Sequence, residues 1–249
     1  MKNRIALVAA GAIAALAGSA NAAAFLTYLD PAGAREVKYT APGVGEQFGT
    51  LVTTATVNLQ IDLTDDLGPG SVVTFTGVTY SKTAKVSAAS MAGSAFTAEV
   101  YDAVFTYTIG ADTILTGSFG TGADDDTGGD LFINGLSGTI SSNSDAVGGS
   151  LVYNFGSANI QAGNPGAGGT LQALLASAGK AFGDAIDANW TLTGITPRPA
   201  LLQNGNLLFL QSFDANAAFS GTVAIVPTPG TAALAACGMV VGLVRRRKA

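Results

Sequence analysis

The segment ATVNLQIDLT, residues 55–64, decides the fold class because its apolar and polar side chains alternate without interruption. Successive side chains of an extended strand point to opposite faces, so a period of two predicts a strand with one buried and one hydrated face. The next residues, DDLGPG at 65–70, have the composition of a turn, and residues 72–80 resume the strand pattern. The segment therefore predicts a β domain in which strands follow one another through short turns.

The same pattern recurs along the chain. Residues 100–109 alternate, with Tyr101, Phe105 and Tyr107 on the predicted buried face, and a short turn leads to a second strand at 113–119. Further strand candidates are residues 131–140, 149–155, 190–195, 206–213 and 218–226, and loops are predicted at 84–98 and 141–149. About nine short strands with Gly-rich connections predict an all-β fold, a β-sandwich or jelly roll.

One segment has a different period. Apolar residues from Leu171 to Ile186 recur at spacings of three and four, which is the helical period, and Thr170 stands where a helix cap is expected. The sequence predicts one helix over residues 170–188, packed against one sheet or across one end of the domain.

The N-terminus has the layout of a signal peptide. Lys2 and Arg4 precede an uncharged apolar run at 5–17, and Ala20 and Ala22 form a small-x-small cleavage site. An uncleaved anchor is the alternative, but a helix of that length rises only about 20 Å against a hydrocarbon core of about 30 Å. The pattern predicts export and cleavage after Ala22.

The C-terminus combines three elements in order. Residues 227–230 form a proline-rich turn, residues 231–244 carry no charge, and Arg245, Arg246 and Arg247 follow directly. Cations after a hydrophobic helix favour leaving that end in the cytoplasm, with the body outside. A plain tail anchor is the alternative interpretation.

This order resembles the PEP-CTERM sorting signal of exported bacterial proteins. Val226, Pro227 and Pro229 match its Val-Pro-Glu-Pro pattern, while Thr228 stands where glutamate is usual. The resemblance implies recognition by an exosortase-type membrane enzyme, which removes the tail near the prolines, and a location at the cell surface or in an extracellular polysaccharide matrix. The predicted organisation is a signal peptide at 1–22, a β-sandwich body at 23–226 and a sorting segment at 227–249.

Charge excludes one class of partner. All 17 acidic residues lie between the two terminal segments, with only six of the 12 basic ones, so the body has a net charge of about −11. Nucleic-acid binding needs clustered cations to neutralise phosphate, and this body has the opposite field. The single cysteine, Cys237, lies in the predicted tail helix, so the body is expected to form no disulfide.

Most catalytic classes lack their residues here. The sequence has no histidine, which excludes Ser-His-Asp and Cys-His machinery and imidazole-based zinc sites. No nucleotide-binding glycine motif is complete. Glycoside hydrolysis needs only two carboxylates and stays open, but Glu99 and Asp102 are three residues apart in a predicted strand and are expected on opposite faces.

The segment DDDTGGD, residues 124–130, is the one local cluster of carboxylates. Asp124, Asp126 and Asp130 on a Gly-rich loop could supply oxygen ligands to calcium, although the twelfth position is Gly135 and not the glutamate of an EF-hand. A solvated acidic loop is the simpler interpretation, and no other cofactor is expected.

These observations predict a non-enzymatic, exported surface protein with a structural or adhesive role. Its expected partners are the exosortase-type enzyme, the membrane before processing, and extracellular polysaccharide or other surface proteins. The alternatives are a carbohydrate-binding module, which exposed aromatic side chains would support, and a secreted hydrolase that uses two carboxylates.

Overall fold

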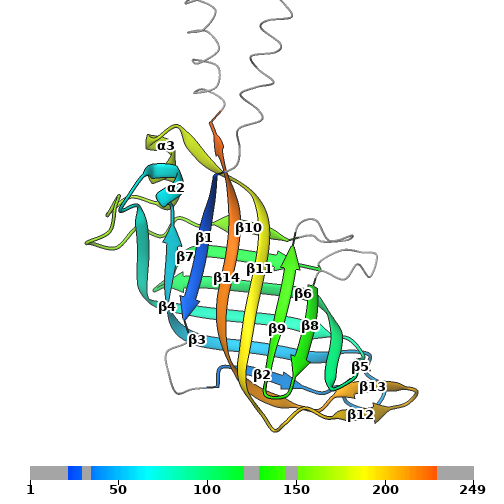
Figure 1. Ribbon diagram of the computed structural model, residues 1–249. Coiled ribbons are helices and arrows are strands. Elements are labelled where there is room, and N and C mark those ends of the chain that lie inside the picture. Colours follow the sequence, from blue (N-terminus) through cyan, green and yellow to red (C-terminus); the bar gives the residue numbers. More distant parts are fainter. Residues whose placement is uncertain (1–21, 30–34, 121–128, 144–150, 229–249) are drawn as a thin grey trace, which may run out of the picture.

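The computed structural model describes residues 22–29, 35–120, 129–143 and 151–228 (Figure 1). Its strands are β1 (Ala22–Leu29), β2 (Val37–Thr40), β3 (Gly49–Asp62), β4 (Val72–Val86), β5 (Ser90–Ala92), β6 (Ala95–Ile109), β7 (Asp112–Phe119), β8 (Gly129–Asn134), β9 (Ser137–Asn143), β10 (Val152–Phe155), β11 (Lys180–Thr196), β12 (Leu201–Asn204), β13 (Leu207–Leu210) and β14 (Phe213–Pro227). Two short helices, α2 (Thr64–Leu67) and α3 (Leu171–Ser177), accompany them. The all-β, sandwich-like class predicted from the sequence is confirmed.

The strands form two layers joined through long strands. Antiparallel pairing runs from β14 through β1, β3, β4, β6, β8, β9 and β11 and returns to β14. In Figure 1 one layer contains β1, β14, β11, β9 and β8, and the strands β3, β4, β6, β7 and β10 of the other layer cross it steeply. Each layer therefore has one face toward the shared core and one face toward solvent.

Strand β6 passes between the layers at a β-bulge. Residues 95–100 pair with β8 and residues 100–108 pair with β4, and the register shifts where Asp102 has a positive φ of 46°. Because the bulge adds a residue, Val100 and Ala103 are buried while Tyr101 is only half-buried. The prediction that Tyr101 belongs to the core is wrong for this reason. The sequence also predicted that Glu99 and Asp102 lie on opposite faces of the strand. This prediction is wrong, because both side chains are exposed.

The predicted helix is much shorter than expected. Only Leu171–Ser177 is helical, with the hydroxyl of Thr170 accepting a hydrogen bond from the Ala173 amide at 3.2 Å, and Gly179 then turns the chain with a φ of 69°. Residues 180–196 pair with β14 instead. Two register shifts between Phe182 and Asp187 place extra residues in β11, so its apolar residues have a spacing that resembles a helix.

Other differences concern strand boundaries. Residues 131–140 belong to two strands, β8 and β9, because Gly135 supplies the positive φ of a tight turn between them. The predicted loop at 84–98 contains β5 and the ends of two longer strands, and residues 141–143 of the other predicted loop extend β9. Strands β1, β2, β5 and β12 are too short or too rich in alanine to have been recognised from their pattern.

The core between the layers is aromatic. Trp190 is 1% exposed, and its ring lies 5.0 Å from that of Phe219 and 5.1 Å from that of Phe105. Its indole Nε1 donates a hydrogen bond of 2.8 Å to the hydroxyl of Tyr80. These contacts hold β11 and β14 of one layer against β4 and β6 of the other, which fixes the shape of the outer surface above them.

Candidate functional site

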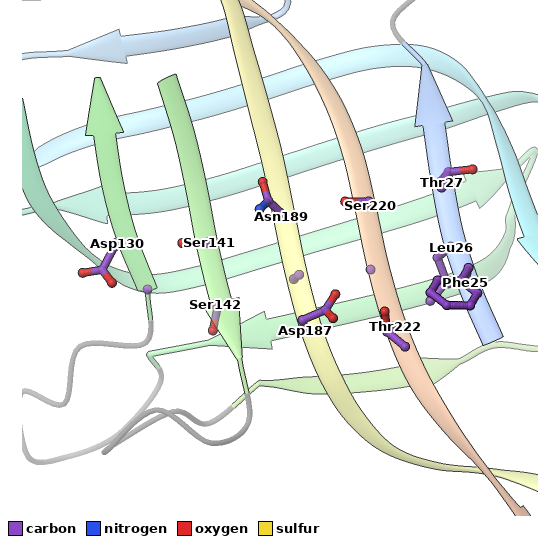
Figure 2. Close-up of a pocket in the computed structure, with 13 residues that line it drawn as sticks. Phe25, Leu26, Thr27, Asp130, Ser141, Ser142, Asp187, Asn189, Ser220 and Thr222 are labelled. Atoms are coloured by element: carbon purple, nitrogen blue, oxygen red, sulfur yellow. The ribbon is translucent and has the colours of Figure 1, made fainter. Parts of the chain in front are cut away.

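A groove lies on the solvent face of the layer that contains β1, β14, β11, β9 and β8. Its volume is about 540 Å³, and Figure 2 shows the side chains that line it across these strands. We call it the outer groove. The lining residues are Phe25, Leu26, Thr27, Gly129, Asp130, Ser141, Ser142, Asp187, Ala188, Asn189, Ser220, Gly221 and Thr222.

Five polar residues of the groove lie in one row, one residue from each strand. Asp130 of β8 is the pairing partner of Ser141 of β9, which pairs in turn with Asn189 of β11. Asn189 pairs with Ser220 of β14, and Ser220 pairs with Thr27 of β1. Figure 2 shows this polar row running across the strands. Such a row arises because all five positions are outward in the alternation of their strands.

A second row lies beside the first, two residues further along each strand. Asp187 of β11 pairs with Thr222 of β14, and Thr222 pairs with Phe25 of β1. The Phe25 side chain is 51% exposed. The groove therefore offers two carboxylates, an amide, several hydroxyls and one apolar ring to a ligand.

A tyrosine beneath the groove braces its second row from the core side. Tyr153 of β10 donates a hydrogen bond of 2.6 Å from its hydroxyl to the backbone carbonyl of Asp187. Burial first, and then the charge of Asp187, raises the pKa of Tyr153, so its hydroxyl keeps its proton. A side chain at Gly221 would collide with this hydroxyl, which explains the glycine there.

Asn189 has an unsatisfied group at the centre of the polar row. Its side-chain oxygen Oδ1 is buried and has no hydrogen-bond partner among the described residues. A buried carbonyl oxygen without a partner loses the hydration that it would have in the unfolded chain. A rotation of the amide group by about 180° would bring this oxygen to the groove, where a ligand that donates a hydrogen bond would restore that interaction.

The carboxylates of the groove are not arranged as a facing pair. Asp130 lies on β8 and Asp187 on β11, with β9 between them and a two-residue offset along the strands, which puts their Cα atoms about 12 Å apart. Figure 2 shows the Asp130 carboxylate directed away from Asp187. Glu99 of β6 is the direct pairing partner of Asp130 but does not line the groove.

Aromatic side chains in the described residues are mostly buried. The exposed ones are Phe25 in the groove and Phe132 on β8, which is 42% exposed. They do not form the continuous exposed row that a flat sugar-binding platform would need. Sugar recognition at this surface would depend on hydrogen bonds more than on ring stacking.

Some residues predicted from the sequence are described and some are not. Val226 and Pro227 end β14, where Pro227 pairs with Lys180 of β11. The Thr228 amide donates a hydrogen bond of 2.9 Å to the Gly179 carbonyl. Ala22 is the first residue of β1. The remaining predicted sorting, cleavage and calcium residues, which are Ala20, Pro229, Arg245, Arg246, Arg247, Asp124 and Asp126, lie outside the described residues.

The described residues also bear on membrane-spanning helices and metal sites. No helix within them has the length and apolar character needed to cross a membrane. Within the same ranges, no group of three or more His, Cys, Asp or Glu side chains is placed to hold a metal ion. Asp130 is exposed at the start of β8.

No local pattern in the sequence indicates the outer groove, because each strand contributes only one or two polar residues to it. In β3, which lies outside the groove, the alternation predicted the outward position of Asn58, Gln60 and Asp62. The alternation does not predict which strands pair with one another, and the groove depends on that pairing. Comparison with known proteins adds no identification: no family model matches the chain, and neither the curated proteins nor the solved structures contain a match.

Proposed function

We propose that the protein is an exported surface protein with an adhesive role, and that it binds extracellular polysaccharide in the outer groove. One observation carries the binding part of the proposal. Five strands place Asp130, Ser141, Asn189, Ser220 and Thr27 in one row, and the Oδ1 atom of Asn189 in its centre has no partner among the described residues.

A polysaccharide suits this surface chemically. Its hydroxyls donate and accept hydrogen bonds, so they can serve the carboxylates, hydroxyls and amide of the groove together. The groove volume of about 540 Å³ lies within the range of about 300–1,000 Å³ typical of ligand sites. Phe25 adds an exposed ring at the edge against which the apolar face of a sugar can pack.

The export part of the proposal is supported by the two predicted processing segments and by where the described chain meets them. Ala22 of β1 pairs with Ile225 of β14, so the predicted signal cleavage site and the proline motif lie at the same end of adjacent strands. With the termini together, the domain would stand on the membrane by one end before the tail is processed. The side of the sheet that contains the groove would then stay accessible to matrix polymers.

Intact mass of the protein from its native host tests the export part. We expect a mature chain that begins at Ala23 and ends near Pro227, found in the envelope or medium fraction. A chain that begins at Ala23 but keeps Arg245 to Lys248 would make the tail a plain membrane anchor and would overturn processing by an exosortase.

Affinity electrophoresis in gels that contain the host's extracellular polysaccharide tests the binding part. We expect the protein to be retarded, and Asn189→Leu to lose the retardation, because leucine has nearly the shape of asparagine but no group that forms a hydrogen bond. Asn154→Leu, on the exposed face of β10 in the other layer, is the matched control and should be retarded like the unchanged protein. Equal retardation of both variants would place binding outside the groove.

A carboxylate-dependent glycoside hydrolase is the second candidate: Asp130 and Asp187 line one groove, although their carboxylates do not face each other. Release of reducing ends from the same polysaccharide separates hydrolysis from binding. Activity that disappears in Asp130→Asn and Asp187→Asn would favour this candidate; retention of the polymer at full length would favour adhesion.

A further inference from the structure

We infer that the ligand of the outer groove is an extended glycan that carries free amino groups and lies across the strands, with about one sugar over each strand. This inference rests on the proposed function and goes beyond it, because it names the orientation and the charge of the polysaccharide. It follows from the direction of the polar row and from the kind of groups that line it.

The direction of the row sets the orientation of the ligand. Thr27, Ser141, Asn189, Ser220 and Asp130 come from five adjacent strands, which are spaced by about 4.8 Å, so the row is about 19 Å long. The advance along an extended chain of pyranose sugars is similar to the spacing of strands in a sheet. A linear glycan laid across the strands would therefore meet an equivalent polar side chain at each successive sugar, whereas one laid along a strand would not.

The charge of the groove sets the charge of the ligand. Its described lining includes the carboxylates of Asp130 and Asp187, and none of the residues in that lining is a lysine or an arginine. A polymer of uronic acids or sulfated sugars would place its anions beside these carboxylates without a cation to balance them. An anionic glycan is therefore disfavoured.

The hydrogen-bonding character of the groove points the same way. Ionised carboxylates only accept hydrogen bonds, and the buried Oδ1 of Asn189 is a further acceptor that lacks a donor among the described residues. A protonated amino group carries three donors, and its hydrogen bonds to carboxylates are stronger than those of a hydroxyl. With the amide group of Asn189 rotated so that its Oδ1 faces the groove, an ammonium group between Asn189 and Asp187 would supply donors to both, since the two residues are neighbours on the outer side of β11.

Paired oligosaccharides test the inference directly. The probes are hexosamine oligomers of defined length with free amines, and the same oligomers after N-acetylation, compared by calorimetry on the exported protein at a mildly acidic pH that keeps the amines protonated. We expect the free-amine oligomers to bind about tenfold or more tightly than their acetylated twins, in keeping with the strength of charge-assisted hydrogen bonds. Affinity should rise with chain length up to about five sugars, one for each strand, and then level off.

Two substitutions distinguish binding in the groove from nonspecific attraction of the amines to the negative charge of the whole protein. Asp187→Asn keeps the shape of the side chain and should remove most of the preference for free amines. Asp112→Asn, at the exposed start of β7 in the other layer, makes the same change of charge away from the groove and should leave the preference intact. An equal loss in both variants would mean nonspecific attraction and would overturn the inference.

The remaining outcomes distinguish the two levels of the proposal. Equal binding of free-amine and acetylated oligomers that is lost in Asn189→Leu would overturn the amino-glycan inference and leave polysaccharide binding in place. Failure to bind either set, together with failure to bind the host polysaccharide, would overturn both. Tighter binding of a polyuronate than of the free-amine oligomers would contradict the charge argument.

Discussion

Asn189 and Trp190 are neighbours in β11, yet they face opposite environments. Trp190 is 1% exposed, contacts three aromatic rings within 5.7 Å and donates a hydrogen bond to Tyr80. Asn189 faces the outer groove with its Oδ1 unpartnered among the described residues. The inner side chain is fixed by packing from both layers, whereas the outer one contributes little to packing. Residues of the outer face are therefore available for binding, and changes there should affect function before stability.

One residue of the inner face departs from this division. Lys82 of β4 points into the core, is only 2% exposed, and its Nζ has no hydrogen-bond partner among the described residues. The nitrogen lies 3.4 Å from the centre of the Trp190 ring. Burial lowers the pKa of Lys82 well below its usual 10.5, because the apolar surroundings disfavour the charged form. The inner face thus contains the Lys82 amino group, whose burial lowers the stability of the fold. The outer face contains the Asn189 Oδ1, which has no hydrogen-bond donor among the described residues.

The largest expected effect separates the two faces at adjacent positions. Trp190→Ala should lower the free energy of unfolding by about 3–5 kcal/mol, because it leaves a cavity between the layers. Asn189→Ala should change it by about 0.5 kcal/mol or less, because the side chain is only partly buried and has no hydrogen bond to the described residues that the change would remove. Urea denaturation followed by circular dichroism measures both. A large loss of stability in Asn189→Ala would mean that this residue serves the fold, and the comparison of the two faces would fail.

Lys82→Met should stabilise the protein by about 1–3 kcal/mol at neutral pH, since methionine fills a similar volume without a polar group that lacks a partner. The gain should appear as a higher denaturation midpoint. Lys85→Met is the matched control, because Lys85 is exposed and pairs with Asp102 at 2.6 Å on the surface. Destabilisation by Lys82→Met would show that the contact of the ammonium with Trp190 outweighs its burial.

The pH dependence of stability should carry the signature of Lys82. Between its lowered folded pKa and 10.5, the unfolded chain binds a proton that the folded chain does not, so stability rises with pH across that window. Burial raises the pKa of Tyr39 to about 12 and also raises those of Tyr80 and Tyr107, so their contribution is complete below the unfolded value of 10.0 and is lost as pH rises above it. Stability should therefore peak near pH 10. In Lys82→Met the increase of stability with pH below the peak should become smaller, whereas the decrease above the peak should remain. If the increase keeps its slope in this variant, groups other than Lys82 cause it.

The smallest expected effect concerns the acidic end of the outer face. Glu99 and Asp130 are direct pairing partners on adjacent strands, and like charges in that position repel. In a chelating buffer Asp130→Asn should raise the free energy of unfolding by about 0.5 kcal/mol, an amount kept small by solvent screening. A calcium-dependent rise in melting temperature that Asp130→Asn and Asp126→Ala both abolish would instead assign a calcium site to the acidic segment.

The parts of the fold that could be predicted from the sequence are those with local causes. The alternation at 55–64 predicted a strand because it depends only on the period of an extended chain, and β3 contains nearly all of it. The prediction of a helix at 170–188 was mostly wrong. After Gly179 the chain pairs with β14, and two bulges in β11 give its apolar residues a helix-like spacing. Tyr101 was misplaced by the bulge at Asp102, which no local pattern announces.

By itself, the sequence determined the all-β class, the acidic character of the body and the absence of histidine chemistry, because these follow from composition and from periods of two residues. It also supplied the prediction of export, through the layout of its two ends. Only the tertiary structure decided that Asp130, Ser141, Asn189, Ser220 and Thr27 lie in one row, and that Lys82 is enclosed beside Trp190. The physical reason is that strand order and register depend on contacts between distant segments, and such contacts leave no period in the sequence.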